Sequence, residues 1–347
     1  MSNADVAQFC NAGQVVIVGA GAWGTTLANL IASTGRRCTL VARTESHAAR
    51  IASTRENERY LPSIRVSDRV EITHDLIMAA RTASVVALVV PSQEMRSAAE
   101  LVGNSVDDNC LLVSCAKGLE LGSLLRMSEV ITAASGVASD RVCVLSGPNL
   151  AREIATGLPA SAVIASSSDE HAQFAQQLLS AASFRIYTSR DVIGVELGGA
   201  LKNIVALGAG VADGLGLGQN AKASFMTRGL AEMIRLGVAA GANPLTFGGL
   251  SGLGDLIATC QSPLSRNRNF GERLGKGVTL AEASAGSPHV VEGLTTARAA
   301  LELAQRYSVE MPIAATVVSV LDGRLNVREA IGTLMSRGAR PELDALA

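Results

Sequence analysis

The feature that most constrains this fold is a glycine-rich turn directly after the first apolar run of the chain. The run is Val15–Val18, and the turn reads Gly19-Ala20-Gly21-Ala22-Trp23-Gly24 before a helical stretch, Thr25–Ser33. In a strand–turn–helix unit with this spacing, Gly19 permits the tight turn, Gly21 lets the backbone approach a pyrophosphate, and Gly24 lets the helix pack close to the strand. The phosphate then lies at a helix N-terminus, which favours an anion. The turn predicts dinucleotide binding; the alternative is an ordinary glycine-rich turn.

The end of the second apolar run, Cys38–Ala42, bears on which dinucleotide binds. A site selective for NAD usually carries an acid there for the ribose 2′-hydroxyl, whereas this chain has Ala42 followed by Arg43. An arginine can hold a 2′-phosphate instead, so the sequence favours NADP over NAD. Glu45 lies close by and would weaken that preference. The alternative is a surface arginine at a strand end.

Short β-branched runs alternate with helical stretches through the first half of the chain, which predicts a Rossmann-type, doubly wound α/β sheet. The further runs of strand length are Val85–Val90, Leu111–Ser114, Val142–Leu145, Ser161–Ala165 and Phe184–Tyr187.

Strand signals stop near residue 190, and long helical stretches follow. The clearest are Val192–Val211, Ala221–Ala240, Leu294–Tyr307 and Pro312–Asp322. A chain of 347 residues is long enough for two cores. We therefore expect a dinucleotide-binding domain over 1–190 and an all-helical substrate domain over 191–347.

Composition excludes several classes of function. The formal net charge of −1 gives no general attraction to nucleic acid or to an acidic membrane surface. The polar stretch Met1–Gln14 lacks the pattern of a signal peptide, and the longest uncharged stretches are broken by Gly, Asn or Lys, so no membrane span is expected. Six scattered cysteines, four histidines and no zinc-type spacing predict buried, reduced thiols and no metal in a cytoplasmic enzyme. The cysteines are Cys10, Cys38, Cys110, Cys115, Cys143 and Cys260.

Lysine is rare: of 30 basic residues only Lys117, Lys202, Lys222 and Lys276 are lysines. A lysine can lose its proton near neutral pH when desolvated and an arginine cannot, so each is a candidate for chemistry. Lys202 is the sharpest candidate, because it is the only charged residue between Glu196 and Asp213. Burial, and a second cation such as Lys117, would lower its pKa toward that of a general acid or base. The alternative is a lysine that extends from a helix edge into solvent.

Several polar loops complete a candidate site. Lys117 follows the run Leu111–Ser114, and Ser146-Gly147-Pro148-Asn149 follows the next run, so both lie where parallel sheets place ligands. Ser265-Arg266-Asn267 suits a phosphate, through a guanidinium fork, an amide and a hydroxyl, with an exposed basic turn as the alternative. Val290-Val291-Glu292-Gly293 is either a cofactor contact or a simple loop.

Seven motifs in order along the chain resemble the bacterial-type NAD(P)-dependent glycerol-3-phosphate dehydrogenases. The motifs are Gly19-Ala-Gly-Ala-Trp-Gly-Thr, Lys117-Gly-Leu-Glu, Ser146-Gly-Pro, Val195-Glu-Leu-Gly-Gly-Ala-Leu-Lys-Asn, Gly252-Leu-Gly-Asp, Ser265-Arg-Asn and Val291-Glu-Gly. The resemblance covers nearly the whole chain. It implies the interconversion of dihydroxyacetone phosphate and sn-glycerol 3-phosphate by hydride transfer with NAD(P)H, for phospholipid synthesis. The preference for NADPH over NADH rests on Ala42 and Arg43. A homodimer is compatible with this assignment.

The resemblance also implies roles for individual residues. Lys202 would exchange a proton with the substrate C2 oxygen, helped by Lys117 and oriented by Asp255. The substrate would contact Lys117, Gly147, Asn149, Ala151, Lys202, Asn203, Asp255, Ser265, Arg266 and Asn267. The dinucleotide would contact Gly19, Gly21, Ala22, Trp23, Gly24, Arg43, Lys117, Arg266, Val290 and Glu292. The family commonly has Thr or Ser where this chain has Asn149, so an amide would replace a hydroxyl there.

Two other classes of protein share parts of this pattern. A two-domain dehydrogenase of β-hydroxyacids can also place a lysine on the first long helix of its second domain, although Arg266 and Asn267 favour a phosphate over a carboxylate. A catalytically silent nucleotide sensor would keep Gly19, Gly21 and Gly24 but would not need Lys202. Oxidation of NADPH in the presence of dihydroxyacetone phosphate distinguishes the three classes.

Overall fold

The computed structural model describes residues 13–285, 290–338 and 341–342, which divide into two compact units. The first unit comprises the described residues up to Ala116, Met127–Leu145 and Asn149–Arg190. The second comprises Lys117–Arg126, Ser146–Pro148 and the described residues from Asp191 onward. The main break thus falls after Arg190, but two earlier loops belong to the second unit. Cys10 and most of the polar N-terminal stretch lie outside the described residues.

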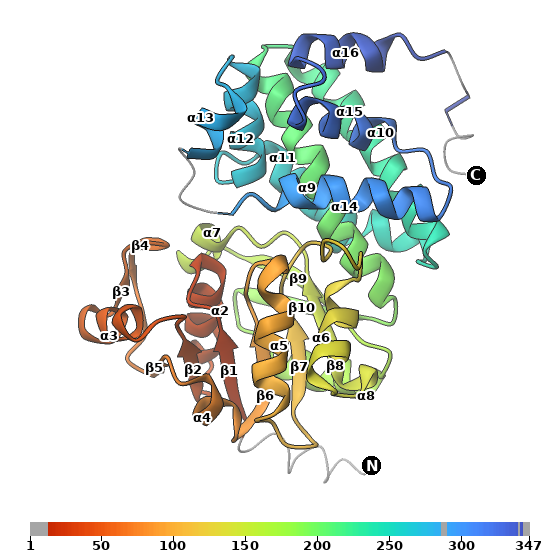
Figure 1. Ribbon diagram of the computed structural model, residues 1–347. Helices are drawn as coiled ribbons and strands as arrows, with labels where there is room; N and C mark the ends of the chain where they lie inside the picture. The colour runs from red at the N-terminus through yellow and green to blue at the C-terminus, as the bar shows by residue number, and fades with distance from the viewer. Residues whose placement is uncertain (1–12, 286–289, 339–340, 343–347) are drawn as a thin grey trace. The chain divides into compact units, whose positions relative to one another are not determined.

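The first unit is built on an eight-stranded sheet (Figure 1). The strands lie in the order β10 (Phe184–Ser189), β9 (Ala160–Ala165), β8 (Val142–Ser146), β7 (Leu111–Ser114), β6 (Ala83–Leu88), β1 (Gln14–Val18), β2 (Cys38–Val41) and β5 (Val70–Thr73). β1 pairs in parallel with β2 on one side and with β6 on the other. The chain therefore reverses its direction of winding at β1, the position where such sheets bind ligands at the carboxyl ends of their strands. The predicted doubly wound fold is confirmed.

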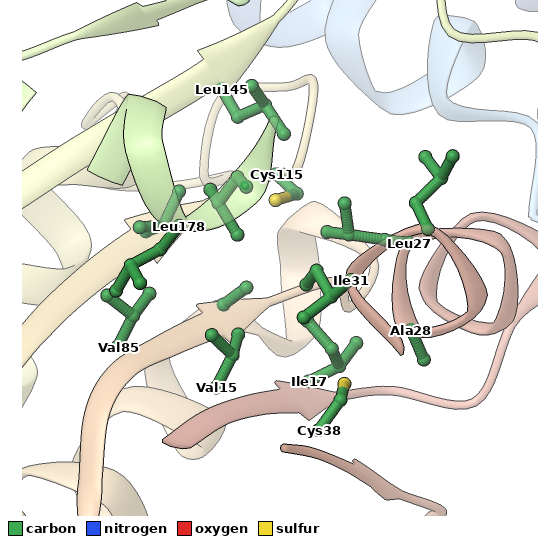
Figure 2. Close-up of a cluster of buried hydrophobic side chains, with 14 of the residues drawn as sticks. Val15, Ile17, Leu27, Ala28, Ile31, Cys38, Val85, Cys115, Leu145 and Leu178 are labelled. Carbon is green, nitrogen blue, oxygen red and sulfur yellow. The ribbon is translucent and has the colours of Figure 1, made fainter. Parts of the chain in front are cut away.

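Apolar residues fill both faces of the sheet, as parallel strands covered by helices require. Figure 2 shows Leu27 and Ile31 of α2 (Ala22–Ser33) packed over Val15 and Ile17 of β1. Val16, between them in sequence, is fully buried as well. The other helices of this unit are α3 (Glu45–Thr54), α4 (Leu76–Ala80), α5 (Met95–Gly103), α6 (Met127–Ser135), α7 (Ala151–Ala155) and α8 (Asp169–Leu179), with short turns η1 (Ser92–Glu94) and η2 (Ser139–Arg141).

Sequence analysis missed the strand at one edge of the sheet, β5, and a small hairpin of β3 (Glu56–Asn57) and β4 (Leu61–Arg65). β5 reads Val-Glu-Ile-Thr, and only Val70 in it is fully buried. A short edge strand of this kind lacks the continuous apolar run by which the other strands were recognised.

The cysteine prediction is confirmed for the five described residues, which are all buried thiols.

The described residues after Arg190 form helices and no strand, as expected. The elements are α9 (Val192–Gly214), α10 (Gly218–Ala239), η3 (Pro244–Gly248), η4 (Leu250–Gly254), α11 (Asp255–Gln261), α12 (Arg266–Gly275), α13 (Leu280–Ala285), α14 (Glu292–Arg306), α15 (Pro312–Leu321) and α16 (Val327–Met335). Sequence analysis found α9, α10, α14 and α15 and missed the others, which carry few apolar repeats.

Helix α9 is the central element of the second unit, and Figure 1 shows it in green among the other helices. It is the one described helix that is long and apolar enough to cross a membrane. However, 83% of its most apolar window is buried inside the structure, as in the core helix of a globular domain.

Glycines bring α9 and α12 into backbone contact, and we call Gly210, Gly214, Gly271 and Gly275 the glycine seam. A Cβ at Gly210 would lie 1.9 Å from the Arg268 carbonyl oxygen, and one at Gly271 would lie 1.9 Å from the Leu207 carbonyl oxygen. Neither helix can carry a larger residue there without moving. The seam therefore fixes the start of α12, which carries Arg266 and Asn267, beside α9.

We expect Gly271→Ala to destabilise the protein strongly. The added methyl group overlaps a backbone oxygen, so the helices must separate, at a cost of about 2 kcal/mol or more. The measurement is thermal unfolding followed by circular dichroism. Gly332→Ala in α16 is the matched control, because a Cβ there meets no atom within 4 Å. It should leave the melting temperature unchanged or raise it slightly, since Ala favours helices by about 1 kcal/mol over Gly. Equal effects of the two substitutions would contradict the proposed close approach.

Candidate active site

The glycine turn of the first unit is shaped by close backbone packing. Gly19 has φ +113°, and a Cβ there would lie 2.4 Å from the Val89 carbonyl oxygen. A Cβ at Gly24 would lie 2.0 Å from the Gly19 carbonyl oxygen. At Gly21, in contrast, a Cβ would meet no atom within 4 Å. Gly19 and Gly24 therefore hold the turn together, while Gly21 leaves open space above it.

Helix α2 begins at Ala22 with backbone N–H donors for an anion. Its N-cap is Gly21, which offers no side-chain cap, and its first turn contains no acid. Orphan N–H groups and the positive end of the dipole suit a pyrophosphate. The residues present thus fit a nicotinamide dinucleotide. Trp23, expected at the cofactor, packs edge-on against Phe184, with ring centroids 5.8 Å apart.

Asn57 supports the turn and was missed by sequence analysis. Its Nδ2 donates to the Ala20 carbonyl at 2.9 Å and to Thr25 Oγ1 at 2.8 Å, and the residue is 1% exposed. It lies 37 residues beyond the turn in sequence, on the unpredicted strand β3, so no local pattern indicated it.

Arg43 extends into solvent just after β2, with 81% of its side chain exposed. Its Nη1 lies 3.2 Å from Glu94 Oε1, an acidic neighbour that sequence analysis did not name. Ala42 is buried and offers no carboxylate. The exposed guanidinium remains available to a phosphate.

Three charged side chains meet in the second unit. Lys202 of α9 donates from Nζ to Asp255 Oδ1 at 2.9 Å, and Lys117 Nζ donates to Asp255 Oδ2 at 2.7 Å. Lys117 also donates to the Gly147 carbonyl at 2.7 Å. The carboxylate of Asp255 therefore bridges the two ammonium groups. The structure brings together the three residues expected to act in catalysis.

Burial dominates the electrostatics of this cluster. Lys202 is 6% exposed, and desolvation lowers its pKa to about 8. The Lys117 ammonium lowers that pKa further, while Asp255 opposes the shift. Burial alone would raise the pKa of Asp255, but the two ammonium groups outweigh it and hold that pKa below its ordinary value. Lys202 can thus exchange a proton near neutral pH beside a fixed negative charge.

The motif Gly252-Leu-Gly-Asp places Asp255 by a tight local fold. η4 is a single π-helical turn in which a Cβ at Gly252 would lie 2.2 Å from the Phe247 carbonyl oxygen. The neighbouring backbone also approaches α9, because a Cβ at Gly198 would lie 2.9 Å from the Ser251 carbonyl oxygen. Asp255 then begins α11, where a helix N-terminus favours a carboxylate.

Thr259 is a member of this cluster that sequence analysis missed. Its Oγ1 accepts from Lys202 Nζ at 2.5 Å and donates to Asp255 Oδ1 at 3.2 Å. It lies four residues after Asp255 on α11, so the helical spacing from a recognised acid was a signal that could have found it.

Two amides expected at the substrate bind other parts of the protein. Asn267 Nδ2 donates to Asn203 Oδ1 at 2.8 Å, and Asn267 Oδ1 accepts from the Gly293 N–H at 3.0 Å. Asn203 Nδ2 also lies 3.5 Å from the Lys117 carbonyl oxygen. These amides link α9, α12 and α14 to the Lys117 loop.

The remaining predicted residues of the second unit gather at the start of α12. Ser265 caps the helix, since its Oγ accepts from the Arg268 N–H at 3.2 Å. Arg266 is exposed, and its Nη1 donates to the Val290 carbonyl at 2.9 Å. Glu292 begins α14 and interacts electrostatically with Arg266. A guanidinium at a helix N-terminus is a suitable phosphate site.

The loop after β8 carries buried polar atoms without a partner among the described residues. They include Ser146 Oγ in the second unit and both Nδ2 and Oδ1 of Asn149 in the first. Ala151 begins α7, and its carbonyl accepts from Thr26 Oγ1 at 3.1 Å. Unsatisfied buried amides are rare in folded proteins, so the Asn149 amide is suited to a polar ligand.

The other two lysines form ion pairs outside the Asp255 cluster. Lys222 forms a buried ion pair with Asp213 at 2.7 Å, and Lys276 forms an exposed one with Glu272 at 2.6 Å.

Among the described residues, no group of three or more His, Cys, Asp or Glu side chains could hold a metal ion.

Comparison with known proteins gives the same family over both units. The model of the NAD-dependent glycerol-3-phosphate dehydrogenase N-terminus matches residues 14–172, and that of the C-terminus matches residues 191–332. A Streptomyces coelicolor protein named glycerol-3-phosphate dehydrogenase [NAD(P)+] is 47% identical over 95% of this chain and 98% of its own length. A Mycobacterium tuberculosis protein, glycerol-3-phosphate dehydrogenase [NAD(P)+] 2, is 49% identical over 95% and 99%.

A solved structure agrees. The crystal structure of glycerol-3-phosphate dehydrogenase from Coxiella burnetii matches with a TM-score of 0.89 and 36% identity, over 94% of this chain and 99% of that one. With both family models matched and close relatives covered nearly end to end, the chain belongs to the NAD-dependent glycerol-3-phosphate dehydrogenase family.

Proposed function

We propose that Lys202 is the proton donor in the reaction of this family, assisted by Lys117 and Asp255. The chain is an NAD(P)-dependent dehydrogenase that interconverts dihydroxyacetone phosphate and sn-glycerol 3-phosphate, a supply of glycerol 3-phosphate for phospholipid synthesis. The observation that carries the assignment of the proton is the burial of Lys202 against a carboxylate, with its pKa lowered to about 8.

The side chains act on the C2 oxygen of the substrate. The bound nicotinamide supplies the hydride that reduces the C2 carbonyl. Negative charge grows on the oxygen as the carbonyl is reduced, and a preorganised ammonium group in a dry site stabilises that charge strongly. Lys202 then gives its proton to the oxygen, so that ketone, NAD(P)H and one proton become alcohol and NAD(P)+.

Lys202 suits proton transfer better than Lys117. The side chain of Lys202 is 7% exposed and that of Lys117 is 18% exposed, and Lys117 is also engaged by the Gly147 carbonyl. A general acid works best when its pKa lies near the working pH, which burial gives to Lys202. Lys117 adds positive charge, and Asp255 orients both groups.

We assign the phosphate of the substrate to Arg266 at the start of α12. The exposed guanidinium and the helix N-terminus both favour a dianion, and Ser265 and Asn267 hold the local backbone through their own hydrogen bonds. The Asn149 amide offers a donor and an acceptor to the substrate. This arrangement favours a phosphorylated substrate over a β-hydroxyacid.

The cofactor is NAD or NADP, and we propose a preference for NADPH because an exposed arginine follows buried Ala42 at the end of β2.

We place the enzyme in the cytoplasm, since buried cysteine thiols suit a reducing compartment. The purified protein should be a homodimer; light scattering would give its mass in solution.

A direct assay tests the function. The purified chain should oxidise NADPH when dihydroxyacetone phosphate is added, and should do so faster than with NADH. A β-hydroxyacid and unphosphorylated dihydroxyacetone are the controls. A rate independent of the phosphate group would refute the proposed substrate site.

Arg43→Ala should weaken the binding of NADPH far more than that of NADH, because only NADPH carries the 2′-phosphate. Loss of a charge-assisted hydrogen bond corresponds to roughly tenfold or more in KM. Steady-state kinetics with both cofactors gives the answer. Arg36→Ala is the control, because Arg36 lies just before the other end of β2. It should change neither the KM for NADPH nor the KM for NADH. Equal increases in the KM for the two cofactors in the Arg43 variant would contradict the assignment of Arg43 to the 2′-phosphate.

Arg266→Ala should raise the KM for dihydroxyacetone phosphate by about tenfold or more, again the scale of a charge-assisted hydrogen bond. Arg328→Ala, an exposed arginine on α16, is the control and should behave as the unmodified enzyme. If the KM of the Arg266 variant is unchanged, the phosphate binds elsewhere.

Lys202→Arg and Lys202→Met should each lose about 10²-fold or more in kcat, the scale for removal of a general acid. Arginine keeps charge but does not release its proton near neutral pH. NADPH affinity should persist, because the pyrophosphate turn lies in the other unit. Lys276→Met, an exposed lysine, should retain full activity. Substantial turnover in the arginine variant would make Lys202 an electrostatic anchor only.

The pH dependence follows from the same group. Reduction of dihydroxyacetone phosphate requires protonated Lys202, so the kcat of this direction should fall as pH rises through about 8. Oxidation of glycerol 3-phosphate requires the neutral amine, so its kcat should rise over the same range. Parallel profiles for the two directions would contradict this role.

A further inference from the structure

Lys117 is carried by a short, self-contained loop, Lys117–Arg126, which we call the lysine hairpin. Leu119 and Arg126 face each other in an isolated antiparallel bridge. Within it, the Glu120 N–H donates to the Leu125 carbonyl at 3.0 Å, and the Leu124 N–H donates back to the Glu120 carbonyl at 2.9 Å. The hairpin is therefore closed by its own hydrogen bonds, with Lys117 and Arg126 at its two chain ends.

Two leucines anchor the hairpin in the core of the second unit. Leu119 is 1% exposed and Leu124 is 4% exposed, and both belong to the apolar cluster that contains Leu197 and Leu201 of α9. Leu124 adopts φ +62°, a left-handed conformation that costs free energy for a residue with a Cβ. Apolar anchors restrain the depth of the loop but are not directional, so they leave its rotation over α9 poorly specified.

Directional contacts tie the hairpin to its neighbours: Asn203 donates to the Lys117 carbonyl and Arg306 to the Ser123 carbonyl, and a buried ion pair holds its C-terminal end. Arg126 Nη1 lies 2.5 Å from Glu196 Oε2, and the two side chains are only 17% and 5% exposed. Glu196 lies on α9, six residues before Lys202, in a helix that is otherwise almost wholly apolar. A buried ion pair contributes little net stability compared with apolar packing, but it restricts the relative positions of the two groups that it joins.

We infer that the Arg126–Glu196 ion pair is a positioning device that fixes the lysine hairpin on α9 and so holds Lys117 against Asp255. This inference rests on the proposed roles of Lys202 and Lys117. Arg126 and Glu196 act through Lys117 and are positioning residues. Their effect reaches Lys202 through the charge of the Lys117 ammonium.

Loss of the ion pair should change a titration as well as a rate. Lys202 is faced by Lys117 of the hairpin and by Asp255 and Cys260 of α11. Lys117 lowers the pKa of Lys202 and Asp255 raises it. If the hairpin rotates and the Lys117 ammonium moves away, the attraction of Asp255 is less opposed, and the pKa of Lys202 rises.

The test is kcat against pH for oxidation of glycerol 3-phosphate, with Arg126→Met and the near-isosteric Glu196→Gln. Each variant should lose about tenfold in kcat, as misplacement of a catalytic group does. Each should also shift the inflection of the profile upward by roughly 0.5 pH unit or more. Arg126→Lys should recover part of both effects.

Controls separate positioning from general damage. Arg298→Met breaks another ion pair of the second unit, with Asp322, and should leave the pH profile unmoved. The Arg126→Met, Glu196→Gln double variant should be no worse than the poorer single one, because both remove the same interaction. If Arg126→Met does not fold, Glu196→Gln decides the question.

Two results would overturn the inference in distinguishable ways. If Lys117→Ala shifts the profile but the Arg126 and Glu196 variants only lower kcat, the ion pair is structural and the inference is wrong. If Lys117→Ala itself leaves the profile unmoved, the proposed role of the lysine pair fails and the inference falls with it.

Discussion

Asp255 places one negative charge between two ammonium groups, and the arrangement of the second unit depends on this contact. Without the carboxylate, Lys202 would be a buried, uncompensated cation, which folded proteins rarely tolerate. Each group comes from a different element: Lys202 from α9, Asp255 from the start of α11, and Lys117 from the lysine hairpin. The cluster therefore exists only when these three elements are correctly packed, so the chemistry of the site depends on the tertiary structure of this unit.

Close backbone packing supplies that accuracy in a chain with only 3% aromatic residues. Few large side chains are available to separate the helices, and the glycine seam lets α9 and α12 touch through their main chains. A backbone contact has no rotamers, so it fixes the spacing of two helices more rigidly than two flexible side chains can. The same principle shapes the first unit, where Gly19 and Gly24 hold the turn before α2.

Sequence alone predicted the features that are local or periodic. The strand–turn–helix unit at Gly19, the seven long strands and the longest helices were found because each has a continuous pattern. Asn57, the Arg126–Glu196 pair and the glycine seam were not found, because each joins segments far apart in sequence or consists of residues with no distinctive chemistry. Thr259 lay between these cases, since its spacing from Asp255 was visible but only the fold shows that Lys202 reaches it. Asn203 and Asn267 show the converse: the motif identified them, yet their amides bind other protein groups.

The rarity of lysine drew attention to Lys117 and Lys202, but it is an incomplete criterion. Lys222 is as buried as Lys202, yet it lies beside Asp213, which also accepts from Arg268, and forms an ordinary ion-pair network. In that network Arg268 also pairs with Glu272, so a second acid contributes, whereas Lys202 and Lys117 share the single carboxylate of Asp255. Burial lowers the pKa of Lys202 to about 8, and the Lys117 ammonium lowers it further against the opposing charge of Asp255. Burial together with the ratio of nearby charges, more than the scarcity of a residue type, therefore distinguishes a lysine that can exchange protons from one that only holds helices together.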